Sequence, residues 1–270
     1  MLTREHAGFL QVNGLQMYVQ RAGLGETLLY ISGTGADLRN KPNQFDSPFA
    51  KRFNMVCFDQ RGLGQTENPQ GQYAMADYAN DAAALMDLVG DEPIRVIGVS
   101  FGGMVAQELA IRYPEKIRAL VLACTSSGGS GQPSYPLHEL EALPAQERIK
   151  RNLQISDNRR TDQWIAENPE QWQQLVELSQ RGRRADRDEN GALKQLQARK
   201  FHDTFDHLHQ LSMPVLLAGG KYDGIAPPEN MRAIARALPN AELRLYEGGH
   251  LFFLQDRQAY PDMIAWLLAH

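Results

Sequence analysis

The chain has 270 residues and a formal net charge of −4. That length suffices for one large domain with a substantial buried core, and the slight negative charge argues against nucleic acid or an anionic membrane surface as a partner. Neither a signal-peptide pattern nor an apolar run of about 18 residues is visible, so we expect a cytoplasmic protein, a monomer or homodimer, that acts on a small-molecule substrate.

The chain opens with a predicted β-hairpin. Two strand patterns, Phe9–Val12 and Leu15–Gln20, flank Asn13-Gly14, which is the strongest short signal for a two-residue hairpin turn. The apolar run Thr27–Ile31 is the next predicted strand. It leads into Ser32-Gly33-Thr34-Gly35, a glycine-rich loop whose backbone N–H groups can approach a ligand. Its spacing matches no nucleotide-binding loop, so no nucleotide is implied.

A short helix around Gln44–Lys51 and a strand at Met55–Phe58 come next. Asp59 and Arg61 directly follow this strand, and we interpret them as residues that order nearby loops by hydrogen bonds. Met75–Val89 has apolar residues at helical spacing and ends at a glycine, which predicts a helix.

The most informative stretch is an apolar run, Ile94–Val99, that breaks into Gly98-x-Ser100-x-Gly102 and continues as a helical pattern to Tyr113. This strand–turn–helix context is that of a nucleophile elbow. The turn is strained and holds the serine clear of the sheet, and the glycines let helix and strand approach closely. The sequence therefore predicts Ser100 as a nucleophile.

After a strand at Ala119–Cys124 and a run of small residues, the pattern becomes amphipathic and charged. We interpret residues 130–206 as a helical insertion that divides a core made of residues 1–129 and 207–270. The helical patterns in the insertion are Pro144–Ile155, Thr161–Arg181 and Ala192–Phe205.

The alternation of strands and helices then resumes and ends with two more strand patterns, each followed by a helical one. Such alternation favours a mainly parallel sheet with helices on both faces. The four patterns are Met213–Gly219, Pro228–Leu238, Glu242–Tyr246 and Phe253–Leu268.

Two polar residues follow the last two predicted strands and complete a catalytic set with Ser100. Asp223 comes just after the strand that ends at Gly219, and His250 comes just after the strand that ends at Tyr246. Both are expected at the carboxyl edge of the sheet, where sites on open α/β sheets form. A serine nucleophile needs a base, and the base needs a carboxylate that fixes its tautomer. The chain order Ser, Asp, His differs from both protease orders.

On these motifs the chain resembles the α/β-hydrolases over nearly its whole length, and residues 98–126 resemble enol-lactonases and small capped esterases most. The resemblance implies an eight-stranded, mostly parallel sheet with a helical cap and a catalytic triad that uses no cofactor and no metal. It also implies an oxyanion hole made by the backbone N–H groups of Thr34 and Phe101. In the oxyanion loop, Ser32 stands where the family usually has histidine.

Gly33 and Leu251 are further candidates for lining the pocket, because they neighbour the oxyanion loop and His250. Trp164 and Trp172 are eight residues apart and are expected on one helix face, where Trp164 either packs the cap or lines the acyl pocket. His202 either faces the cavity or lies on a solvated face. The histidines at 202, 207 and 209 match no zinc spacing.

Ester or lactone hydrolysis is the activity that these residues favour. Two alternatives stay open: a C–C bond hydrolase of the meta-cleavage-product type, which shares the triad, and a non-catalytic receptor on the same fold. A meta-cleavage product carries a carboxylate, so its site must supply a cation. The nearby cap arginines at 181, 183, 184 and 187 have acidic neighbours that indicate an exposed loop. We therefore expect a largely apolar pocket that prefers uncharged esters or lactones.

Overall fold

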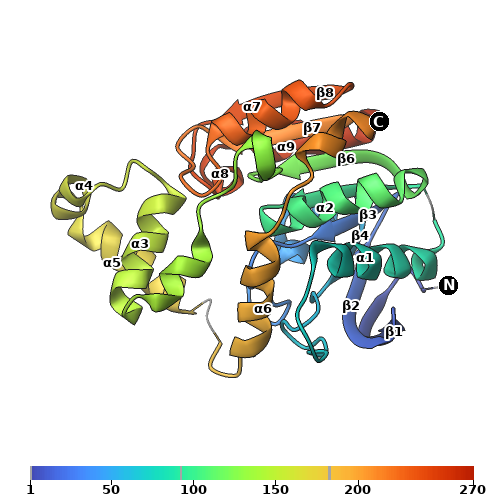
Figure 1. Ribbon diagram of the computed structural model, residues 1–270, viewed down its shortest axis with the longest axis horizontal. Coiled ribbons are helices and arrows are strands. Elements are labelled where there is room, and N and C mark those ends of the chain that lie inside the picture. The colour runs from blue at the N-terminus through green and yellow to red at the C-terminus, as the bar shows by residue number, and fades with distance from the viewer. Residues whose placement is uncertain (1, 92, 182–183) are drawn as a thin grey trace.

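The computed structural model describes residues 2–91, 93–181 and 184–270 and contains an eight-stranded sheet (Figure 1). Its order is β1-β2-β4-β3-β5-β6-β7-β8, with β2 antiparallel to both neighbours and the other pairs parallel. The predicted mainly parallel sheet is thus confirmed. The strands are β1 (His6–Val12), β2 (Leu15–Gly23), β3 (Thr27–Ile31), β4 (Asn54–Phe58), β5 (Ile94–Val99), β6 (Ile117–Ala123), β7 (Val215–Gly220) and β8 (Ala241–Tyr246).

The hairpin at the antiparallel edge forms where the sequence predicts it. Val12 pairs with Leu15, and the two turn residues, Asn13 and Gly14, have φ angles of 48° and 79°. A two-residue turn with positive φ at both positions matches the twist of the flanking strands. Asn and Gly tolerate that conformation best, which is why this dipeptide was a reliable signal.

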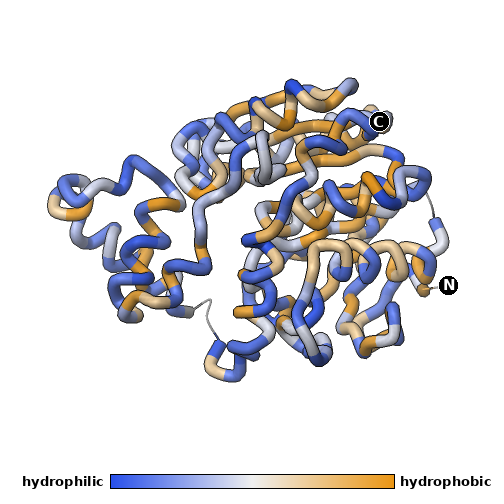
Figure 2. The backbone as a smooth tube through the Cα atoms, viewed as in Figure 1, coloured by the Kyte–Doolittle hydropathy of each residue, from blue (hydrophilic) through white to orange (hydrophobic). Residues whose placement is uncertain are grey.

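Helices cover both faces of the sheet. The helices α1 (Met75–Val89), α2 (Phe101–Arg112) and α7 (Pro228–Ala237) pack in one apolar cluster, and α9 (Ala259–Ala269) packs in the other. Along β5 the side chains alternate between the two clusters because successive residues of a strand face opposite ways. Figure 2 shows the result as apolar strands between helices that carry hydrophilic residues on their outer sides.

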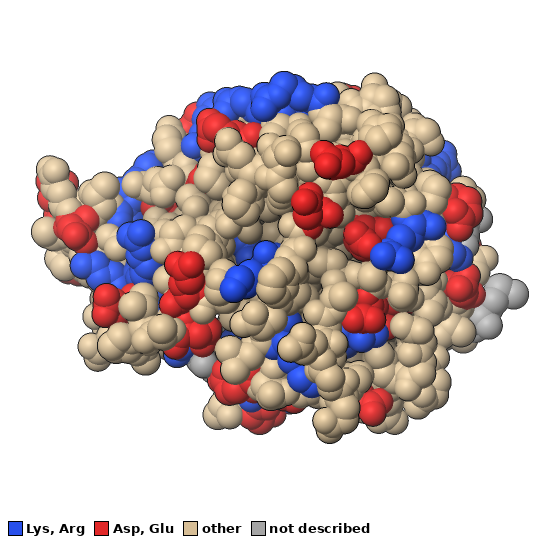
Figure 3. All heavy atoms as spheres, in the orientation of Figure 1, with Lys and Arg blue, Asp and Glu red and all other residues tan. Residues whose placement is uncertain are grey.

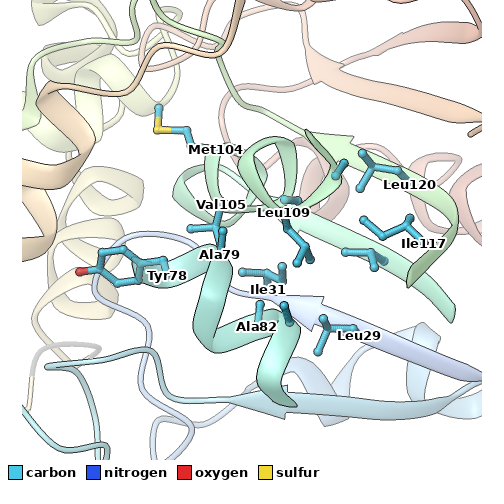
Figure 4. Packing of buried hydrophobic residues seen from close by; sticks show 14 of the residues in the cluster. Leu29, Ile31, Tyr78, Ala79, Ala82, Met104, Val105, Leu109, Ile117 and Leu120 are labelled. Atoms are coloured by element: carbon cyan, nitrogen blue, oxygen red, sulfur yellow. The ribbon is translucent and has the colours of Figure 1, made fainter. Parts of the chain in front are cut away.

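The cluster on the α1 and α2 face is drawn in Figure 4. Ala79 from α1 and Val105 from α2 point toward Leu29 and Ile31 on β3, whereas the Tyr78 ring points away from β3 and packs edge-on against Phe101. All six side chains are at most 1% exposed. This packing fixes α2, and with it the elbow at its start, against the sheet.

Four further helices lie between β6 and β7, inside the expected insertion: α3 (Ala145–Ser156), α4 (Asp162–Glu167), α5 (Pro169–Arg181) and α6 (Glu189–Lys200). Figure 1 shows α3, α4 and α5 standing away from the sheet, with α4 farthest out. In contrast, α6 lies against loops of the core, where Lys194 Nζ donates to Asn68 Oδ1 at 2.9 Å. The domain boundaries at 129/130 and 206/207 remain a prediction.

Three predicted helices are wrong in their extent. The pattern Thr161–Arg181 forms two helices because Pro169 disfavours a helical conformation at Asn168, whose φ and ψ are −131° and 54°. Trp164 and Trp172 therefore sit on different helices and do not share one helix face. The helix predicted to end at Phe205 is α6, which ends at Lys200. The helix predicted at Phe253–Leu268 is divided into α8 (Phe252–Gln255) and α9.

The predicted helix at Gln44–Lys51 is instead a pair of 3₁₀ turns, η1 (Gln44–Asp46) and η2 (Pro48–Lys51). A proline at the start of the second turn cannot continue a preceding helix, because it lacks an N–H and clashes with the turn before it. The remaining 3₁₀ turns are η3 (Pro114–Lys116), η4 (Gly129–Gly131), η5 (Leu137–Ala142) and η6 (Phe205–Gln210).

Among the described residues, no helix is long and apolar enough to cross a membrane. Figure 3 shows basic and acidic side chains interspersed over one face of the molecule. Such mixing gives no broad attraction to a polyanion from this face.

Candidate active site

Ser100 stands in the strained turn between β5 and α2. Its φ and ψ are 56° and −115°, a conformation that a non-glycine residue adopts only when the surrounding structure holds it. A Cβ on Gly98 would lie 2.4 Å from Gly102 O, and a Cβ on Gly102 would lie 2.0 Å from Ile31 O. Both contacts are too short for any side chain, so the elbow requires glycine at these two positions.

The side chains of Ser100, His250 and Asp223 form one hydrogen-bonded chain, which we call the triad. Ser100 Oγ lies 2.9 Å from His250 Nε2, and His250 Nδ1 lies 2.7 Å from Asp223 Oδ2. Asp223 Oδ1 accepts two further hydrogen bonds, from the backbone N–H groups of Ile225 and Ala226. The structure therefore brings together all three residues that the sequence predicts as nucleophile, base and acid.

The end of α3 is bonded to both loops that carry the base and the acid. His250 N donates to Ser156 O at 2.6 Å, and Gly224 N, next to Asp223, donates to Ile155 O at 2.9 Å. These contacts tie the helical insertion directly to the triad. Sequence reasoning missed them, because the partners are far apart in the chain and carry no local signal.

Of the two expected oxyanion donors, Thr34 lies on the glycine-rich loop that follows β3, and Phe101 is the first residue of α2. The N–H groups of Thr34 and Phe101 make no hydrogen bond within the described part of the chain. A Cβ on Gly33 would lie 3.4 Å from Ser100 Cβ, so the glycine-rich loop passes close beside the nucleophile. Phe101 itself is fully buried under Tyr78, which fixes its backbone at the start of α2.

A pocket of about 680 Å³ opens beside the triad and is lined by Ser100 and His250. It shares Gly35, Asn152 and Leu251 with a second pocket of about 720 Å³, which extends beneath α3 and α5. The two pockets thus form one cleft between the core and the insertion. Gly33 and Leu251 line it as the sequence predicts.

Two predicted pocket residues lie elsewhere. Trp164 lines neither pocket, because α4 is at the outer end of the insertion (Figure 1). His202 also lies outside the cleft: its ring is anchored by a hydrogen bond from Nε2 to Ser126 O at 3.1 Å, and it lines a separate small cavity.

Arg187 lies in the loop that precedes α6, as the sequence predicts, but its side chain is only 27% exposed. It lines the cleft, and its guanidinium lies over the oxyanion loop, with Nη1 3.7 Å from the place of a Cβ on Gly35. Its neighbour Arg184 is paired with Asp186 at 2.9 Å, as expected for a surface loop. Arg183 lies outside the described residues. The lining that we expect to be largely apolar therefore includes four arginines, at 148, 160, 184 and 187, of which Arg187 also lines the pocket beside Ser100.

Asp59 and Arg61 have the structural roles that the sequence predicts. Asp59 accepts hydrogen bonds from Leu38 N and Gln65 N, and burial raises the pKa of its carboxyl to about 6 although both bonds lower it. Arg61 makes a two-point ion pair with Asp81 on α1, with both distances 2.7 Å. Neither residue lines the cleft.

Comparison with known proteins places the chain in a family. The family model for the alpha/beta hydrolase fold matches residues 26–148 and 128–257. The chain belongs to this α/β-hydrolase family. The expected family and fold are thereby confirmed. A poly(3-hydroxyalkanoate) depolymerase of Ectopseudomonas oleovorans is 30% identical over 246 residues, which is 88% of this chain and 82% of that one.

Solved structures of other α/β-hydrolases support the same fold. The enol-lactonase of Burkholderia xenovorans LB400 superposes with a TM-score of 0.77 at 18% identity and covers 97% of this chain and 100% of its own. A meta-cleavage product hydrolase of Pseudomonas fluorescens IP01 gives 0.76 at 17% identity, covering 97% of this chain and 98% of its own. At such identities the likeness concerns the fold alone.

Proposed function

We propose that this α/β-hydrolase is a serine hydrolase that cleaves a carboxylic ester or lactone of a small to medium, mostly apolar molecule. The observation that carries the proposal is the unbroken hydrogen-bonded chain from Ser100 Oγ through His250 to Asp223, at the wall of a cleft of adequate size. The relative named as a poly(3-hydroxyalkanoate) depolymerase supports the same reaction class.

In the proposed mechanism Ser100 Oγ attacks the carbonyl carbon while His250 Nε2 accepts the serine proton. Asp223 holds the proton on Nδ1 and stabilises the imidazolium. The N–H groups of Thr34 and Phe101 then donate to the oxyanion. The leaving alcohol oxygen takes the proton from His250, and a water attacks the acyl-enzyme in the same way to release the acid. This sequence needs no cofactor.

Labelling with a fluorophosphonate tests the nucleophile. We expect one label per chain, at Ser100, because a base and two oxyanion donors are arranged around that hydroxyl. The Ser100→Ala variant should take up no label. A screen of p-nitrophenyl esters, lactones and a vinylogous diketone then identifies the reaction. A chain that takes no label and turns over none of these substrates would support the receptor alternative.

The C–C bond hydrolase alternative gains support from one observation. Arg187 supplies a cation in the cleft, and a carboxylate-bearing diketone requires such a cation. The sequence alone does not predict a cation there. The vinylogous diketone in the screen separates the two reactions, because an esterase releases little product from a substrate without an ester bond.

A further inference from the structure

The loop that carries the expected oxyanion donor Thr34 is held on both sides of that residue by glutamine side chains. Gln60 Nε2 donates to Ser32 O at 2.8 Å, and Gly35 N donates to Gln195 Oε1 at 2.9 Å. Both glutamine side chains are buried. The Thr34 N–H lies between the two anchored residues and makes no hydrogen bond within the described part of the chain. The position of that N–H therefore depends on both anchors.

Gln195 is the anchor that comes from the helical insertion. It lies on α6, 160 positions from Gly35 in the sequence, whereas Gln60 directly follows the core strand β4. Because a backbone N–H can only donate, the oxygen of the Gln195 amide must face Gly35. The Nε2 atom of the same amide is buried and has no hydrogen-bond partner among the described residues. Among these residues, the bond to Gly35 is thus the one hydrogen bond of this side chain.

The core fixes the helix that carries Gln195. A Cβ on Gly191, at the start of α6, would lie 1.9 Å from Gly62 O in the loop after β4, so no side chain fits between helix and loop. Lys194, which precedes Gln195, donates from Nζ to Pro69 O at 2.7 Å. A helix docked this closely has little freedom to move, and the position of the Gln195 amide is fixed with it.

We propose that Gln195 is a positioning residue for the oxyanion hole: by holding Gly35 N, it keeps the Thr34 N–H directed at the oxyanion beside Ser100. A Cβ on Gly33 would lie 3.4 Å from Ser100 Cβ, so the loop has no slack at this point. An oxyanion donor must lie about 2.7 to 3.1 Å from the charge, and a displacement of about 1 Å removes most of its effect. This role rests on the proposed hydrolase function, since it concerns the transition state of that reaction.

Two variants separate the hydrogen bond from the packing of the side chain. Gln195→Met has a similar length but no acceptor for Gly35 N, so kcat for the best ester of the screen should fall about tenfold or more, with KM within about threefold. Gln195→Glu keeps an oxygen acceptor whether the carboxyl is protonated or not. Its kcat should therefore stay within about threefold of the wild type.

A trifluoromethyl ketone with the acyl group of that ester measures the oxyanion hole directly. Ser100 Oγ adds to its carbonyl carbon while His250 takes the serine proton, and the carbonyl oxygen becomes an oxyanion. The Ki of this inhibitor should rise in Gln195→Met by the same factor by which kcat/KM falls, because both report binding of the tetrahedral oxyanion. The acid limb of the kcat profile, which reports His250, should not move. A shifted limb would mean that the substitution disturbs the triad and would overturn the proposal.

Lys194→Met is the matched control. It removes a bond that docks the same helix but leaves Gly35 untouched, so its kcat should stay within about threefold of the wild type. Equal losses of kcat in Lys194→Met and Gln195→Met would overturn the proposal, because the effect would then come from helix docking. The Tm of Gln195→Met should stay within about 4 °C of the wild type, since the lost amide makes a single hydrogen bond.

A Gln195→Met protein that loses Tm but keeps kcat would show a structural role alone and also overturn the proposal. If Gln195→Met does not fold, the smaller Gln195→Leu makes the same comparison, and an unchanged kcat in it decides against the proposal. The wild type separates the two levels of inference. A wild type that takes no fluorophosphonate label and hydrolyses no ester contradicts the proposed function itself, whereas an active wild type with an equally active Gln195→Met contradicts only the role of Gln195.

Discussion

At the scale of single residues, Asp223 shows how the triad depends on the hydrogen bonds of one side chain. Its Oδ1 accepts two backbone N–H groups, at 2.8 and 2.9 Å, so an asparagine in its place would keep its carbonyl oxygen there. The amide NH₂ would then face His250 Nδ1, which would have to become an acceptor. In that tautomer Nε2 carries the proton and cannot take one from Ser100.

Asp223→Asn should therefore lower kcat by about 10³- to 10⁴-fold while the protein stays folded. The measurement is steady-state hydrolysis of the best ester from the screen, with circular dichroism as the folding check. Asp206→Asn, an exposed change on η6, is the control and should have no effect. A loss below about tenfold in Asp223→Asn would mean that another carboxylate orients the base.

His202 makes a different contribution, to the pH dependence of stability. Its folded-state pKa of about 4 lies below the ordinary value of 6.5, so the folded protein favours the neutral ring. As the pH falls from about 6.5 to 4, the histidine takes up a proton in the unfolded state but not in the folded state, and this favours unfolding. The free energy of unfolding therefore falls by about 2 kcal/mol between pH 7 and pH 5.

Urea unfolding at pH 7 and pH 5 measures this effect. Between pH 7 and pH 5, the free energy of unfolding should fall by about 2 kcal/mol less in His202→Gln than in the wild type. This difference does not depend on how much the substitution changes the stability at pH 7. The control His207→Gln replaces an exposed histidine and should keep the wild-type pH dependence. Equal pH dependence in wild type and His202→Gln would contradict the assignment.

At the scale of elements, the elbow depends on the close approach of α2 to β3. In most helices an alanine in place of glycine adds stability, by about 0.5 to 1 kcal/mol. At position 102 the added Cβ would lie 2.0 Å from the backbone oxygen of Ile31, which cannot move without shifting β3. At position 102 the cost of this steric clash exceeds the gain in helix propensity.

We expect Gly102→Ala to lower the free energy of unfolding by more than about 2 kcal/mol and to abolish activity, because α2 and Ser100 must move together. Urea unfolding and ester hydrolysis are the measurements. Gly8→Ala is the control: a Cβ on Gly8 would have no neighbour closer than 3.9 Å, so its effect should be small. A stable, active Gly102→Ala protein would show that the contact is looser than the structure has it.

At the scale of the whole molecule, the features that could be predicted from the sequence are those set by local signals. The turn at Asn13-Gly14, the helix α1 and the strand–elbow–helix unit around Ser100 each follow from residues adjacent in the chain. The positions of Asp223 and His250 at one sheet edge follow from the parallel topology, because carboxyl ends of parallel strands meet there.

What could not be predicted depends on tertiary contacts. The hydrogen bond from His250 N to Ser156 O joins positions far apart in the chain, and no local sequence pattern predicts it. Trp164 was a plausible pocket residue until the break at Asn168 placed α4 at the outer end of the insertion. Arg187 has the sequence context of a surface loop, and only the fold of the insertion over the core brings it near Ser100.

The charge of the cleft follows from how its ionised groups are paired. The two carboxylates beside Ser100, on Asp46 and Glu141, are both engaged: Asp46 accepts from Asn43 N, and Glu141 pairs with Arg148 at 2.8 Å. The Arg187 side chain is 27% exposed, and its Nε makes no hydrogen bond to any described residue. The Glu189 carboxylate lies 4.0 Å from that Nε and is more than half exposed, so water screens this pair.

From this arrangement we predict a substrate preference opposite to the one expected from the sequence. A carboxylate on the substrate can pair with the Arg187 fork, so a carboxylate-bearing ester should bind at least as well as its neutral analogue. Arg187→Ala should then raise KM for the carboxylate ester about tenfold, with kcat nearly unchanged, and leave KM for the neutral analogue within about threefold.

Steady-state kinetics on a matched pair of esters, one ending in a carboxylate and one in its methyl ester, makes the measurement. Arg184→Ala is the control, because Arg184 lies in the same loop and is paired with Asp186, and it lines the second pocket but not the pocket beside Ser100. Equal rises in KM for both esters would mean that Arg187 only packs the cleft, and equal effects of the two arginine variants would mean that the loop acts through its overall charge. If the neutral ester remains about tenfold the better substrate of the wild-type protein in kcat/KM, the original expectation of an uncharged substrate is right and the cation near Ser100 serves the loop alone.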